Sequence, residues 1–161
     1  MRESIRTLLI IGAHPDDCEA RAGGLAAKYR KLGQAVKFVS VTNGDAGHHQ
    51  MGGSELAARR LREARRVAEE FGIEYDIWDI PDGRLIADLA TRDRVIREIR
   101  AFRPDLVITH RPNDYHPDHR ATGTLVMDAS YLIRVPNICP DIPDLRHTPV
   151  ILYLQDFFTK P

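Results

Sequence analysis

The sequence predicts an α/β fold, a mainly parallel, doubly wound sheet with helices on both faces, formed as a single domain. Short runs of β-forming residues alternate with longer helical stretches, and turn residues mark each change. Four strand–loop–helix units follow one another, which is the connectivity of a parallel sheet. The chain has 161 residues, 43% of them hydrophobic, and this is enough for one core.

The first unit begins with an uninterrupted apolar run. Leu8 to Ile11 is typical of a strand that is buried on both faces. The loop over residues 13–17 leads into a helix that we expect over about residues 19–32. Gly33 follows it and is a natural helix-ending residue.

The second unit repeats this order. Residues 36–42 have β-strand character, and residues 43–53 are glycine-rich, as is typical of a loop. Ser54 is then expected to cap a helix over about residues 55–71, whose apolar side chains fall along one stripe. Gly72 ends this helix.

The last two units complete the sheet. A third strand over residues 75–80 precedes a turn and a helix over residues 89–102, in which four apolar side chains face inward. A fourth strand over residues 105–109 leads through a polar loop into a helix over about residues 118–133. Residues 150–154 are a candidate last strand.

The composition excludes several classes of protein. Lys plus Arg and Asp plus Glu both number 23, so there is no net positive charge to attract nucleic acid or an anionic membrane. Two cysteines are too few for a disulfide framework or a structural zinc site. Nothing in the sequence approaches the length of a membrane span. We therefore expect a cytoplasmic protein with no nucleic-acid partner.

Polar residues gather in the loops that follow the first four strands. In a parallel sheet the carboxyl ends of the strands meet at one rim, so residues about 100 positions apart can come together. The candidates at this rim are His14, Asp16, Asp17, Asn43, Asp45, His48, His49, Asp82, Asp114, His116, Asp118 and His119.

The spacing of these residues indicates a metal site. His14 and Asp17 form one i, i+3 pair, and His116 and His119 form another, which lets the side chains of a pair point the same way. Imidazole and carboxylate suit Zn²⁺, and a catalytic zinc has three protein ligands and one open position. One pair plus one histidine would supply the ligands, and the other side chains would be left for proton transfer in metal-assisted hydrolysis.

Each motif also has a purely structural interpretation. A lone His-Pro-Asp is common in loops, where the aspartate caps the following helix, and Asp118 keeps this alternative. Cys18 is expected to be a small buried side chain rather than a nucleophile. We interpret the remaining histidines as polar loop residues or structural residues: His48, His49, His110 and His147.

Four motifs occur in order over about residues 7–133. They are Ala13-His14-Pro15-Asp16-Asp17, Thr42-Asn43-Gly44-Asp45-Ala46-Gly47, Arg60-x-x-Glu63 and His116-Pro117-Asp118-His119. Together they resemble the LmbE-like or PIG-L-type N-acetylglucosaminyl deacetylases, which are zinc enzymes on a Rossmann-like sheet. One departure is Cys18, which stands where the family often has Glu.

The resemblance implies a zinc-dependent hydrolase that removes the acetyl group from an N-acetylated amino sugar. It implies that His14, Asp17 and His119 bind the metal, for which Fe²⁺ is the alternative to Zn²⁺. It also implies that Asp16 is the general base that takes a proton from the attacking water.

Further roles follow from the same resemblance. His116 would be protonated and would stabilise the oxyanion or hand a proton to the leaving amine, and Asp118 would orient it. Arg60, and with it Asp45 and Asp82, would contact the substrate.

Relatives of this kind generally continue well past residue 161. We therefore expect residues 1–161 to form one deacetylase domain that is short in, or lacks, the family's C-terminal part, and a homo-oligomer is one way to complete the pocket. Two other functions stay open, namely an amide hydrolase for a non-sugar N-acyl substrate and a catalytically silent metal-binding or regulatory module.

Overall fold

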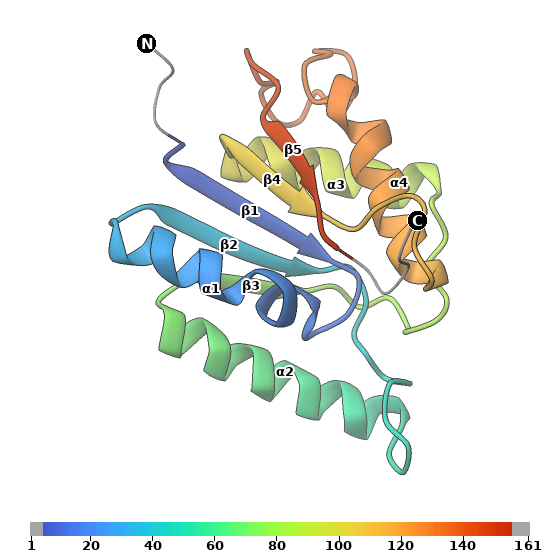
Figure 1. Ribbon diagram of the computed structural model, residues 1–161. Helices are drawn as coiled ribbons and strands as arrows, with labels where there is room; N and C mark the ends of the chain where they lie inside the picture. Colours follow the sequence, from blue (N-terminus) through green and yellow to red (C-terminus); the bar gives the residue numbers. More distant parts are fainter. Residues whose placement is uncertain (1–4, 156–161) are drawn as a thin grey trace, which may run out of the picture.

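The structure, a computed structural model, describes residues 5–155. Within them a parallel sheet alternates with helices along the chain (Figure 1). The strands are β1 (Thr7–Gly12), β2 (Ala35–Ser40), β3 (Glu74–Ile77), β4 (Leu106–Thr109) and β5 (Val150–Tyr153), and the helices are α1 (Asp17–Lys31), α2 (Gly53–Phe71), α3 (Leu89–Phe102) and α4 (Pro117–Leu132). In this part of the chain no helix has the length and apolar character needed to cross a membrane.

The order of the strands brings the loops after β1 and β4 together. The sheet runs β3-β2-β1-β4-β5, so the chain moves outward from β1 to β3 and then returns to the other side of β1. Ile11 of β1 pairs with Val39 of β2 and with Thr109 of β4, so these strands end at the same level. The predicted parallel, doubly wound α/β fold is confirmed.

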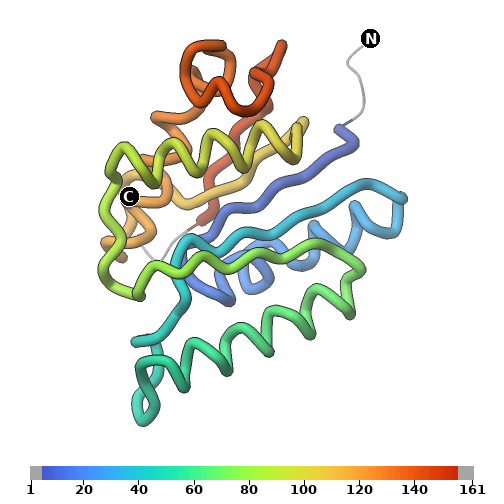
Figure 2. Tube along the Cα trace, turned by 180° about the vertical axis from the view of Figure 1, so that it is seen from behind, coloured from blue at the N-terminus to red at the C-terminus, as the bar shows by residue number. Residues whose placement is uncertain are grey.

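Both faces of the sheet are covered by helices, which explains the uninterrupted apolar run in β1. Leu8 and Ile10 belong to the cluster under α1 and α2, and Leu9 and Ile11 belong to the cluster under α3 and α4 (Figures 1 and 2). All four side chains are fully buried. Burial of each contributes roughly 1.5–3 kcal/mol, so β1 is held firmly in the core.

Most predicted boundaries lie within two residues of the observed ones, and α3 matches its prediction. Its start is fixed by Asp88, whose side chain accepts a hydrogen bond from the Thr91 amide. The prediction that Ser54 caps α2 was wrong, because the helix already begins at Gly53, with Gly52 in the cap position. β3 is shorter than expected and ends at Ile77.

The segment after α4 is held by one buried cation. The guanidinium of Arg100 on α3 is almost fully buried and donates hydrogen bonds of 2.7–3.1 Å to backbone carbonyls. These carbonyls belong to Leu132, Ile133, Val135, Ile138, Cys139 and Ile142. Arg100 therefore donates hydrogen bonds to the carbonyls at the C-terminal end of α4, which lack partners within the helix, and orders the irregular stretch that follows it.

Candidate metal and active site

A pocket of about 470 Å³ opens at the carboxyl ends of the strands. It lies where the loops after β1 and β4 meet, at the point where the strand order reverses, as expected for a ligand site in this architecture. The chemically active side chains that line it are His14, Asp16, Asp17, Arg60, Asp82, Tyr115, His116 and His119.

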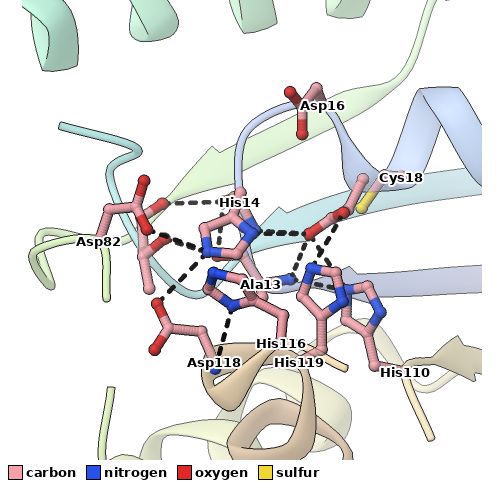
Figure 3. Close-up of polar contacts among 12 residues, drawn as sticks. Ala13, His14, Asp16, Cys18, Asp82, His110, His116, Asp118 and His119 are labelled. Carbon is pink, nitrogen blue, oxygen red and sulfur yellow. Dashed lines mark hydrogen bonds and ion pairs between the residues drawn. The ribbon is translucent and has the colours of Figure 1, made fainter. Parts of the chain in front are cut away.

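The three predicted metal ligands all line this pocket. Figure 3 shows two of them, His14 and His119, near each other. His14 Nδ1 lies 3.3 Å from Asp17 Oδ2, and His119 Nε2 lies 3.5 Å from Asp17 Oδ1. The His14 and His119 rings have their centroids 5.2 Å apart. Among the described residues, the groups whose donor atoms all lie within 4.8 Å of one another are His14 with His116 and His119, Asp17 with His110 and His119, and His14 with Asp82 and Asp118. Each group contains at least one of the three predicted ligands, and together they offer the imidazole and carboxylate donors that suit zinc.

The loop after β1 folds back tightly to place Asp17. A Cβ at Gly12 would lie 2.8 Å from the Asp17 Cβ, so only glycine leaves room for this approach. Asp17 Oδ2 accepts hydrogen bonds from the Ala13 and His14 amides at 3.1 and 2.8 Å. Because these bonds engage Oδ2, Oδ1 is the oxygen that is left to face His119.

The charges of the pocket are strongly coupled. Burial opposes the charge on His14, but contacts with Asp118, Asp17 and Asp82 outweigh it and raise the pKa of His14 to about 12. Burial likewise opposes the charge on Asp17, yet its histidine neighbours hold the pKa of that carboxyl far below its usual range. A cation is therefore favoured between these groups, and a divalent metal would replace the proton.

Asp16 stands apart from this cluster (Figure 3). Its backbone has φ 157° and ψ −22°, a conformation that is uncommon for a non-glycine residue and is a feature of functional loops. Its side chain is 55% exposed and lies 3.8 Å from the Arg60 guanidinium. Partial burial and the charge of Asp17 raise the pKa of Asp16, which suits a proton acceptor.

His116 occupies the cap position of α4. Its Nδ1 accepts a hydrogen bond of 3.2 Å from the Asp118 amide, so the remaining ring nitrogen, Nε2, carries the proton of the neutral imidazole. Burial and the nearby His14 and His119 lower the pKa of His116. This differs from the expectation of a protonated His116, although a neutral imidazole still offers one N–H donor.

The Asp118 carboxylate has other partners than the sequence suggested. It lies 3.3 Å from His14 Nε2 and accepts hydrogen bonds from the Gly83 and Leu85 amides, at 2.6 and 3.3 Å. It is therefore directed to His14 rather than to the His116 ring, and the capping side chain of α4 is His116 instead of Asp118. The turn after β3 accounts for this difference, because its Gly83 and Leu85 amides donate hydrogen bonds to the two Asp118 oxygens.

The three predicted substrate contacts lie in different surroundings. Arg60 lines the pocket and is held by Glu63 at 3.1 Å. Asp82 also lines it, with Oδ1 3.1 Å from His14 Nε2. Asp45 instead accepts a hydrogen bond of 2.9 Å from the Asp82 amide, so it joins the loops after β2 and β3.

From the sequence, Asp114 is expected at this rim without a specific role, His110 is interpreted as a polar loop or structural residue, and Tyr115 is not singled out. His110 Nε2 lies 3.1 Å from Asp17 Oδ2, and its ring stacks on His119 with centroids 3.8 Å apart. Asp114 Oδ1 lies 2.9 Å from His119 Nδ1. Tyr115 lines the pocket and meets His119 edge-on. The available signal was position, because all three follow β4 at the same rim.

The structure agrees with the expectation that His48 and His49 are polar loop residues and that Cys18 is a small buried side chain. His48 stacks on His49 and accepts hydrogen bonds from the Gln50 and Met51 amides within its loop. Cys18 is fully buried, and burial raises the pKa of its thiol well above the usual value, so it is not a thiolate nucleophile at neutral pH.

Comparisons with known proteins agree with this geometry. The family model described as PIG-L, GlcNAc-PI de-N-acetylase, matches residues 9–130. A diacetylchitobiose deacetylase from Thermococcus kodakarensis is 34% identical over 139 residues, which are 83% of this chain and 52% of the relative. A 4-oxalmesaconate hydratase from Pseudomonas putida is 27% identical over 143 residues, 84% of this chain and 55% of the relative.

A solved structure shows the same fold. The N,N'-diacetylchitobiose deacetylase from Pyrococcus horikoshii, in complex with an inhibitor, superposes with a TM-score of 0.88 at 26% identity. The match covers 96% of this chain and 62% of that one. The chain spans about half the length of the curated relatives named above.

Proposed function

Because the chain belongs to the PIG-L family of GlcNAc-PI de-N-acetylases, we propose that it is a metal-dependent hydrolase that removes the acetyl group from an N-acetylated amino sugar. The observation that carries the proposal is the meeting of His14, Asp17 and His119 in one pocket with Asp16 and His116 beside them. This arrangement supplies a metal site, a proton acceptor and an N–H donor, which amide hydrolysis requires.

The metal and the residues divide the reaction between them. A zinc ion held by His14, Asp17 and His119 would acidify a water molecule and polarise the amide carbonyl. Asp16 accepts the proton of the attacking water and later gives it to the leaving amine, which its position at the pocket wall and its raised pKa favour. His116 donates its Nε2 hydrogen to the oxyanion of the tetrahedral intermediate.

The opposite wall receives the sugar. Arg60, fixed by Glu63, presents its guanidinium to the pocket beside Asp16 and would donate to sugar hydroxyls. Asp82 offers a carboxylate from the turn after β3. Gly44 lines the wall next to Pro15 in a conformation with φ of +68° that favours glycine, so the wall stays low and the pocket stays open.

The test is acetate release from N,N'-diacetylchitobiose and a panel of N-acetylglucosamine conjugates, with metal content measured on the same samples. We expect about one zinc per chain, and Asp16→Asn should keep the metal while losing roughly 10²–10⁴-fold in kcat. Asp79→Asn is the matched control, because Asp79 lies outside the pocket and contacts Asn43 at its exposed edge. Metal-loaded protein that releases acetate from no sugar or N-acyl amine would contradict the proposal.

A second candidate is a hydratase, since a relative with this name matches 84% of the chain. It would add water to a carbon–carbon double bond with the same metal ligands. The two functions can be told apart by testing the same protein on N-acetyl sugars and on an unsaturated carboxylic acid. Loss of absorbance from an unsaturated tricarboxylate such as 4-oxalmesaconate, without acetate release from any sugar, would favour the hydratase.

The remaining features of the proposal concern the whole protein. We propose Zn²⁺ as the ion, with Fe²⁺ as the alternative that anaerobic purification and elemental analysis would reveal. Cys18 and Cys139 are both free thiols, which fits a reducing compartment such as the cytoplasm. We propose that residues 1–161 form one deacetylase domain, and size-exclusion chromatography with light scattering would show whether it forms a homo-oligomer.

A further inference from the structure

The residues around the predicted metal ligands fall into two layers. His14, Asp17 and His119 line the pocket, whereas Asp118, His110 and Asp114 lie behind its floor. The side chains of this second group are only 1–3% exposed. Neither substrate nor solvent reaches them from the pocket, so they do not act on a reacting atom.

Each ligand contacts the buried layer through a polar atom, and His119 also stacks on the His110 ring. His14 Nε2 lies 3.3 Å from Asp118 Oδ2, and His119 Nδ1 lies 2.9 Å from Asp114 Oδ1. Asp17 Oδ2 lies 3.1 Å from His110 Nε2 (Figure 3). The contacts of His14 and Asp17 join different elements, because these two ligands follow β1 while the buried residues follow β4 or begin α4.

The two ring nitrogens of each histidine ligand face different neighbours. His14 turns Nδ1 and His119 turns Nε2 toward Asp17, and the other nitrogen of each ring meets a buried carboxylate. His14 Nε2 also lies 3.1 Å from Oδ1 of Asp82, which lines the pocket. A metal-binding imidazole needs this division, since one nitrogen must be free to bind the cation and the other must carry hydrogen. The buried carboxylate beside each ring, Asp118 for His14 and Asp114 for His119, selects this tautomer and fixes the plane of the ring.

From these contacts we propose that Asp114, Asp118 and His110 are positioning residues, which hold the three metal ligands in binding geometry from behind the pocket. Asp114 and Asp118 fix the two imidazoles, and His110 holds Oδ2 of Asp17 so that Oδ1 faces the cation. Asp114 also accepts a hydrogen bond of 3.1 Å from the His116 amide, so one carboxylate sets both the ligand and the start of α4. The inference rests on the proposed metal site but needs no particular substrate.

The test measures metal affinity rather than turnover. The full-length chain is stripped of metal, and its affinity for Zn²⁺ is determined by competition with a chromogenic chelator, with the absorption spectrum of the Co²⁺ form recorded as a report on ligand geometry. We expect Asp114→Asn, Asp118→Asn and His110→Gln each to bind Zn²⁺ roughly 10–100-fold more weakly and to alter the Co²⁺ spectrum.

Asp105→Asn is the matched control. Asp105 precedes β4 at the opposite end of the strand, where its carboxylate bonds to the Arg6 and Thr7 amides. This variant should lose stability and keep its metal affinity. Circular dichroism of each metal-free variant tests whether it is folded. If Asp114→Asn does not fold, His110→Gln and Asp118→Asn give the same comparison.

Unchanged Zn²⁺ affinity and an unchanged Co²⁺ spectrum in the folded variants would overturn the inference, as would a wild-type chain that binds no metal. Failure of the proposed function can be distinguished from failure of this inference. A wild-type chain that binds zinc but releases no acetate would defeat the deacetylase proposal, while weaker binding by the variants would still support the buried layer.

Discussion

Gly123 sets how closely α4 approaches the loop that follows β4. A Cβ at this position would lie 2.5 Å from the His110 carbonyl oxygen, with Arg111 C and Pro112 N at 2.9 and 3.0 Å. All three atoms belong to the backbone, so no side chain can simply rotate away. Gly123→Ala would therefore force α4 and the loop apart by about 0.9 Å, the shortfall from the 3.4 Å at which ordinary contact begins.

The displaced helix carries His119, one turn before Gly123. Metal sites tolerate changes in ligand distance of about 0.2 Å, so a shift several times larger should weaken metal binding on the order of 100-fold. Overpacking should also destabilise the metal-free chain by about 1–3 kcal/mol. The assays are a urea unfolding curve of the metal-free protein and a competitive zinc titration.

Gly24→Ala is the matched control. Gly24 lies in α1, and a Cβ added there would meet no atom within 4 Å, so alanine should stabilise the helix by about 0.5–1 kcal/mol and leave zinc affinity unchanged. If Gly123→Ala behaved like Gly24→Ala, gaining stability and keeping its affinity, the reasoning about α4 would be refuted.

Three further predictions concern stability. Arg100→Met should lower the free energy of unfolding by about 3–5 kcal/mol, because buried carbonyls lose their donor. Arg97→Met breaks only an exposed ion pair with Asp141 and should change the urea midpoint far less, so similar midpoints for the two variants would contradict this. Burial opposes the charge on Asp105, but the Arg6 and Thr7 groups lower its pKa, so its contribution is present above the unfolded pKa of about 3.9 and is lost as pH falls through the folded value. The stability gap between wild type and Asp105→Asn should therefore close below about pH 4 in urea titrations, and a gap that widens there would show the wrong sign. With free zinc at about 1,000 times its Kd, the wild-type unfolding temperature should be roughly 8–16 °C higher than after a chelator has removed the zinc. His119→Ala should show no zinc-dependent change of unfolding temperature by calorimetry.

Much of the fold follows from local sequence rules. The apolar run Leu8–Ile11 predicts a strand covered on both faces, and the structure buries it fully. The four strand–loop–helix units then fix a parallel sheet, whose carboxyl ends must meet. For this reason the gathering of His14, Asp17 and His119 at one rim could be predicted across about 100 positions of sequence, although their spacing alone did not give atomic distances.

The choice of partner within the rim was beyond the sequence. Asp118 lies two residues from His116, so the local pattern favours a contact between them. The structure directs the carboxylate to His14 instead, because the turn after β3 packs its Gly83 and Leu85 amides against Asp118. Which imidazole a carboxylate meets depends on how α4 is rotated against that turn, and this is a property of tertiary packing.

The proposed metal ligands and the neighbouring pocket wall come from different parts of the rim. The three proposed ligands come from the loop after β1, the start of α1 and α4, which are joined to the two central strands β1 and β4. Gly44, Ala46 and Gly47 line the pocket from the loop after β2, and this loop is joined to the turn after β3 through Asp45. We therefore expect exchanges at residues 44–47 to change which molecules enter the pocket while leaving the proposed metal ligands in place.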